Sequence, residues 1–157
     1  MPVLKLKDNV QSWLLSSLND PIVKIISNNS HLTATQLETL LIDVLSENIA
    51  ATSLNYDEKA RLRLTKAQIS RGAFNRTLKQ AKQNVTKSIY TVILLGYLGL
   101  FETTTLDPYL EIANKLHTYL EAYKGAPHTT EDLAERLKLI EMMRDELESS
   151  LKQLSSS

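Results

Sequence analysis

Charge segregation restricts how this chain can fold, although its formal net charge is zero. Half of its eighteen lysines and arginines lie in residues 59–87, and this segment contains no aspartate or glutamate. Positive charges at helical spacing repel each other and lower helix stability when no acidic partner lies one turn away. A helix formed by this segment therefore needs a compensating counter-ion. The nine basic residues are Lys59, Arg61, Arg63, Lys66, Arg71, Arg76, Lys79, Lys82 and Lys87.

Composition favours a helical protein. The 157 residues fit one domain with an appendage, or two very small domains. Hydrophobic residues make up 43% of the chain, which is enough for a packed core. Four glycines and four prolines are few for an all-β or loop-rich protein, whereas leucine, lysine, glutamate, glutamine and alanine favour helices. We therefore expect an all-α fold.

Apolar periodicity and capping signals locate the expected helices. They cover residues 8–18, 22–27, 34–49, 56–64, 73–98 and 107–124, and a last helix begins at residue 129 or 130. Asp20 before Pro21 and Thr33 before Gln36 are expected N-terminal caps, and Gly99 is an expected C-terminal cap. The helix expected at residues 73–98 could be interrupted at residues 84–86. The apolar stripe of the third helix is Leu37, Leu40, Leu41, Val44 and Leu45.

The helix expected from residue 73 onward has two distinct faces. At 100° per residue, one face is apolar and should dock on the core; it contains Phe74, Leu78, Ala81, Val85, Ile89 and Val92. The opposite face presents Arg76, Lys79, Gln83 and Lys87, flanked by Asn75 and Lys82. Long cationic and amide side chains contact phosphates and read base edges. This face is therefore a candidate nucleic-acid-binding surface.

Residues 69–78, Ile-Ser-Arg-Gly-Ala-Phe-Asn-Arg-Thr-Leu, resemble the turn and recognition helix of helix-turn-helix regulators. Residues 97–102 are similar to the helix end and first wing strand of winged-helix proteins. The resemblance implies a DNA-binding domain over residues 1–124, with one short wing hairpin and a recognition segment at 66–99. Residues 70–83 would enter the major groove of DNA, and the helix at 56–64 would contact the sugar-phosphate backbone of DNA. The expected DNA-binding residues are Lys66, Ser70, Arg71, Asn75, Arg76, Lys79, Lys82, Gln83 and Lys87.

The last helix, in residues 129–157, has a heptad pattern. Its seam residues alternate spacings of four and three: Leu133, Leu137, Ile140, Arg144, Leu147, Leu151 and Leu154. A seam this narrow favours a coiled coil that joins two copies into a homodimer. The alternative is packing onto the protein's own body. Seven acidic and three basic residues in 131–148 should keep this helix away from DNA.

Signals for catalysis, metals and membranes are absent from the sequence. Three isolated histidines and no cysteine make neither a metal site nor a nucleophile–base pair, and no glycine-rich phosphate loop is present. We expect no enzyme, metal or cofactor. The longest apolar run has about twelve residues, where a spanning helix needs roughly 20, and the N-terminus lacks a signal-peptide pattern. We expect a soluble, cytoplasmic protein associated with the nucleoid and without a membrane partner.

The leading hypothesis is a dimeric protein that binds double-stranded DNA with sequence specificity or partial specificity. It would act as a transcription regulator, or as a nucleoid or segregation factor. An adaptor whose basic face meets an acidic protein is the first alternative. RNA binding is less favoured, because stacking aromatic residues are sparse in the basic segment. Peripheral membrane attachment would require basic and apolar groups of residues 73–101 to share an exposed surface, whereas the apolar half is expected to be buried.

Overall fold

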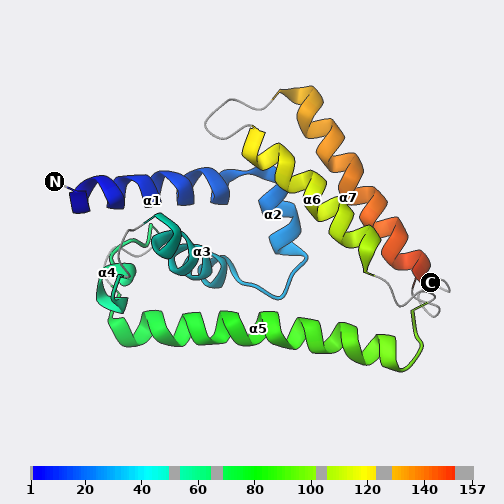
Figure 1. Ribbon diagram of the computed structural model, residues 1–157, viewed down its shortest axis with the longest axis horizontal. Coiled ribbons are helices and arrows are strands. Elements are labelled where there is room, and N and C mark those ends of the chain that lie inside the picture. Colours follow the sequence, from blue (N-terminus) through cyan, green and yellow to red (C-terminus); the bar gives the residue numbers. More distant parts are fainter. Residues whose placement is uncertain (1, 50–53, 65–68, 102–105, 123–128, 151–157) are drawn as a thin grey trace. The chain divides into compact units, whose positions relative to one another are not determined.

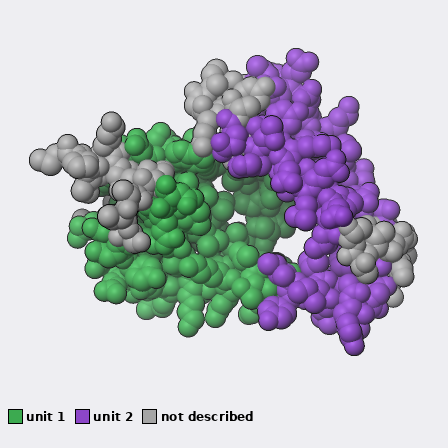
Figure 2. Space-filling view, in the orientation of Figure 1, with its two compact units in different colours: residues 1–88 green, residues 89–157 purple. Residues whose placement is uncertain are grey.

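The computed structural model describes residues 2–49, 54–64, 69–101, 106–122 and 129–150. In these ranges the chain forms seven helices and no strand (Figure 1), which confirms the all-α prediction. The chain divides into two units, residues 1–88 and 89–157 (Figure 2). The predicted domain boundary at residue 124 falls inside the second unit. The predicted wing hairpin extends over residues 102–105, which lie outside the described residues.

Local capping defines the first two helices. α1 (Pro2–Asn19) begins six residues before its predicted start, with a proline at its first position. α2 (Pro21–Asn28) begins as predicted, because the Asp20 carboxylate accepts hydrogen bonds from the backbone of Ile22 at 2.7 Å and Val23 at 3.2 Å. The Asp20 side chain thus fixes the start of α2 directly after the end of α1.

α3 (Ala34–Ile49) starts at the predicted capping box, where Thr33 and Gln36 exchange hydrogen bonds of 3.1 and 3.2 Å. The predicted apolar stripe is not its most buried face. The stripe leucines are half-buried, and Val44 is 50% exposed. The fully buried positions are Glu38, Thr39, Ile42, Asp43 and Ser46, four of which are polar. The helix therefore carries a polar side into the interior of the first unit.

Two further helices of the first unit are α4 (Tyr56–Ala60) and α5 (Arg71–Tyr97). Seven buried apolar side chains form the core of this unit. They come from α1, α3, α4 and α5 and from the segment between α4 and α5. They are Val10, Leu14, Ile42, Ala60, Leu62, Phe74 and Leu78. α4 ends four residues before the predicted Leu64. Leu62 and Arg63 turn inward there, and the backbone N–H of Leu64 donates to the Glu38 carboxylate at 2.6 Å. The Leu64 N–H therefore binds a side chain of α3, and α4 does not continue for another turn.

α5 is one unbroken helix. Ser70 caps its start by accepting from the backbone of Ala73 at 3.1 Å, so that it begins two residues earlier than predicted. Asn84 does not break it: its amide donates to the His31 carbonyl at 3.2 Å and to Gln36 at 3.0 Å. Gly99 ends it as predicted, with a φ of 70° and the Leu100-to-Leu95 backbone bond of a Schellman motif.

In the second unit, α6 (Asp107–Ala122) packs against α7 (Thr130–Ser150). Ile112 of α6 and Ile140 of α7 are buried in this pair, and the Arg136 side chain is only 2% exposed. The Thr129 hydroxyl caps α7 by accepting from the backbone of Asp132 at 3.1 Å. The two helices thus form an antiparallel hairpin with its own small core.

Candidate nucleic-acid interface

Acidic residues of α3 are the counter-ions for part of the basic segment. The Lys59 ammonium lies 2.8 Å from Asp43 Oδ1 and 3.3 Å from Glu47 Oε1. The Lys82 ammonium lies 3.3 Å from the other Asp43 oxygen. Arg63 Nε lies 4.0 Å from Glu38 Oε1, and both side chains are almost completely buried. These pairs join different helices, so the absence of acidic residues one helical turn away in the sequence gives no sign of them.

Burial and pairing act in opposite directions on Asp43 and Lys59. Burial alone would raise the pKa of the Asp43 carboxyl, but hydrogen bonds from Lys59 and Lys82 outweigh it and hold that pKa below its ordinary value. Burial would likewise lower the pKa of Lys59, and its bonds to Asp43 and Glu47 raise it instead. Both groups are therefore held in their charged forms.

Most of the exposed cations that remain lie on α5, and Arg61 is exposed at the end of α4. Arg71, Arg76, Lys79 and Lys87 are exposed, and the 27 residues of α5 include no acidic residue. Arg76 and Lys79 form no ion pair with any described residue. We call the following set the cationic face of α5: Arg71, Arg76, Lys79, Lys82, Gln83 and Lys87.

The predicted DNA-binding residues have different environments. Ser70 is committed as the cap of α5, and Asn75 is half-buried. Arg71 lies 6.0 Å from the centre of the Tyr56 ring, a cation–π distance that orients its guanidinium. Lys82 is 58% exposed but paired with Asp43. Lys66 lies outside the described residues.

The helix-turn-helix resemblance does not extend to the geometry between α4 and α5. Ten residues separate Ala60 from Arg71, whereas the turn of that motif has about three or four. Leu62 and Arg63 in this connection are buried against the first unit. The connection between α4 and α5 is therefore longer than the turn that the resemblance implies.

The predicted docking face of α5 is correct only in its first half. Phe74, Leu78 and Ala81 are buried, but Val85 is 42% exposed and Ile89 is 57% exposed. A helical projection identifies which residues share a face, but it does not show how far along the helix a covering element extends. The prediction that the apolar half of α5 is buried was wrong.

The heptad seam of α7 is divided by its packing on α6. Ile140 is buried in the hairpin, and Leu133 is half-buried. Leu137, Arg144 and Leu147 are exposed, whereas Leu151 and Leu154 lie outside the described residues. The whole seam cannot join two copies of the chain while the hairpin is intact, because Ile140 is already buried inside the α6–α7 hairpin. The structure thus favours the alternative that α7 packs on the protein's own body.

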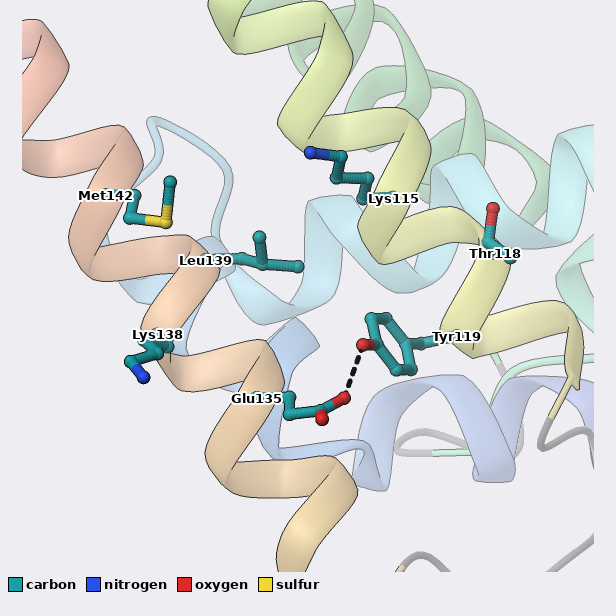
Figure 3. Close-up of a pocket in the computed structure, with 7 residues that line it drawn as sticks. All are labelled: Lys115, Thr118, Tyr119, Glu135, Lys138, Leu139 and Met142. Atoms are coloured by element: carbon teal, nitrogen blue, oxygen red, sulfur yellow. Dashed lines mark hydrogen bonds between the residues drawn. The ribbon is translucent and has the colours of Figure 1, made fainter.

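A groove of about 550 Å³ lies along this hairpin (Figure 3). The Tyr119 hydroxyl points from α6 toward α7 and donates to Glu135 at 2.6 Å, so these two polar groups bind each other across the groove. The lining residues are Lys115, Thr118, Tyr119, Glu135, Lys138, Leu139 and Met142. In the described part of the chain, no cluster of three acidic or histidine side chains could hold a metal ion.

No protein-family model, curated protein or solved structure matches this chain. None of the described helices is long and apolar enough to cross a bilayer. The arrangement of charges on α5 is therefore the main guide to function.

Replacing Asp43 by alanine should destabilise the protein by about 3 kcal/mol, because it leaves the Lys59 ammonium buried without its closest partner. The matched replacement Lys82→Ala should cost less than about 1 kcal/mol, because Lys82 is largely solvated. Urea unfolding followed by circular dichroism measures both values. Equal losses would show that the buried pair does not control stability.

Asp43 should also make stability depend on pH. Its folded-state pKa lies below the ordinary value of 3.8, so its contribution is complete above that pH and is lost as the pH falls through the folded-state pKa. The difference in unfolding free energy between the native protein and Asp43→Asn should therefore shrink as the pH falls below about 4. A constant difference over that range would contradict the assignment.

Proposed function

We propose that the protein binds double-stranded DNA through the cationic face of α5. One observation carries this proposal: Arg71, Arg76 and Lys79 are exposed on a helix that contains no acidic residue. Such a face lacks the interleaved glutamates that a solvated helix normally has. Phosphates would compensate its charge and release the counter-ions of DNA.

The dimensions of α5 suit a duplex. Its first turn carries Arg71, and helix N-termini favour phosphate groups. Arg76 and Lys87 are separated by about 16 Å along the axis, at 1.5 Å per residue. The major groove is about 12 Å wide and admits an α-helix. Gln83 lies between them and could hydrogen-bond an adenine edge.

The ion pairs of α3 support this function indirectly. Lys82 lies between the buried ion pairs and the cationic face of α5, because it binds Asp43 and its side chain is still 58% exposed. The Asn84 amide bonds hold α5 to the loop before α3 and to α3 itself. The cations of the exposed face are thus presented on a helix that is fixed to its unit, so that little side-chain and backbone ordering is needed on binding.

We infer a role in transcription regulation or nucleoid organisation, without catalytic activity. The charge pattern favours contacts to phosphates, and these hold a protein on DNA irrespective of sequence. Gln83, together with the half-buried Asn75, provides the groups for sequence preference.

The variant Arg76→Gln with Lys79→Gln tests DNA binding, because both side chains are exposed and unpaired among the described residues. It should bind a duplex more weakly, and the slope of log affinity against log salt should fall by roughly two, or about 0.9 for each lost phosphate contact. Fluorescence anisotropy over a salt series measures both effects.

The matched control is Lys24→Gln with Lys138→Gln, which removes two exposed lysines on other helices. It should bind DNA with unchanged affinity and slope. Equal weakening of DNA binding in both variants would show that the affinity depends only on the net charge of the protein, and not on the cationic face of α5. Absence of duplex binding by the native protein at micromolar concentration would refute the proposal and favour an adaptor for acidic proteins.

A further inference from the structure

The second half of α5 exposes an unusual amount of apolar surface. Residues 89–98 contain no charged side chain, and six large apolar members are more than half exposed: Ile89 57%, Tyr90 68%, Ile93 60%, Leu94 54%, Tyr97 88% and Leu98 59%. Monomeric proteins rarely leave a contiguous apolar patch of this size in water, and such patches usually mark an interaction surface. We call these six residues the apolar end of α5.

The spacing of the apolar end suits another helix. Tyr90, Ile93 and Tyr97 follow one another at intervals of three and four, and Leu94 lies beside them on the same face. This is the spacing with which one helix packs along a second helix. The two tyrosines combine a large apolar ring with a hydroxyl that can remain solvated at the rim of an interface.

We propose that the apolar end of α5 binds the same segment of a second copy of this chain, in antiparallel orientation. The exposed area is sufficient: each tyrosine contributes on the order of 200 Å² and each aliphatic side chain about half of that, or roughly 800 Å² per copy. A specific protein–protein interface buries about 800 Å² on each partner. A twofold pair also satisfies the requirement that the same patch serve both subunits.

The charges of α5 select the antiparallel orientation. Arg76 and Lys79 precede the apolar end on the same helix, and α5 contains no acidic residue. A parallel pair would place these two cations beside their counterparts, where like charges repel. An antiparallel pair centred near Ile93 and Leu94 sends the two cationic segments to opposite ends.

The interface differs from the one that the heptad seam of α7 predicts. Ile140 and Arg136 of that seam's helix are buried in the hairpin with α6. Only Leu137 and Leu147 remain as exposed apolar seam residues in the described part of α7, at 37% and 41%. The apolar end of α5 has more exposed apolar side chains in a shorter segment, and it needs no rearrangement to use them.

Light scattering of the full chain at micromolar concentration tests the dimer. The native mass should be twice 17.7 kDa, whereas Ile93→Glu with Tyr97→Glu should be a monomer with an unchanged circular dichroism spectrum. The matched control, Leu137→Glu with Leu147→Glu on α7, should remain a dimer. A monomeric native protein, a dimeric α5 variant or a monomeric α7 control would each overturn the proposal.

The absence of native cysteine allows the orientation to be tested with single cysteines. Leu94→Cys, close to the twofold axis, should cross-link to its counterpart through a short bifunctional maleimide, whereas Thr86→Cys should not. Efficient cross-linking of both variants would indicate a parallel pair. If the native chain is a monomer that sediments with phosphatidylserine vesicles, the apolar end binds a membrane surface instead, and the dimer is refuted. Neither result depends on DNA binding.

Discussion

The buried carboxylate of Asp43 joins three helices of the first unit. It binds Lys59, next to the end of α4, and Lys82, in the middle of α5, from its position on α3. Two buried or half-buried charges are stable in an interior only when they are paired and hydrogen-bonded. The contact therefore fixes which sides of α3, α4 and α5 face one another, and Glu38 extends the same role to Arg63 and the Leu64 backbone.

Among the cations of residues 59–87, this network distinguishes two groups with different roles. Lys59 and Arg63 are structural, because their side chains are almost completely buried. The second group is exposed to solvent on α5, a helix that contains no acidic residue. It consists of Arg71, Arg76, Lys79 and Lys87. A charge count over the sequence treats both groups alike. Burial separates them, because a buried cation such as Lys59 cannot contact a polyanion and an exposed one can.

The two halves of α5 point to two different interactions. Its first half is anchored by Phe74 and Leu78 and presents cations on the opposite side. Its second half exposes Tyr90, Ile93 and Tyr97. Nucleic-acid binding by one half and self-association by the other are compatible, because they use different residues of one helix. An antiparallel dimer would present two cationic segments, and two sets of phosphate contacts raise affinity and its salt dependence.

The sequence by itself determined the all-α class and most helix ends, because caps such as Asp20, Thr33 and Gly99 act within a few residues of the backbone groups that they satisfy. It also identified Phe74 and Leu78 as core residues and Arg76 and Lys79 as exposed ones. Only the tertiary structure decided that Asp43 neutralises Lys59 and Lys82, that Ile140 packs on α6, and that the end of α5 is uncovered. These properties depend on groups far apart in the chain, and helical periodicity contains no information about which distant residues meet.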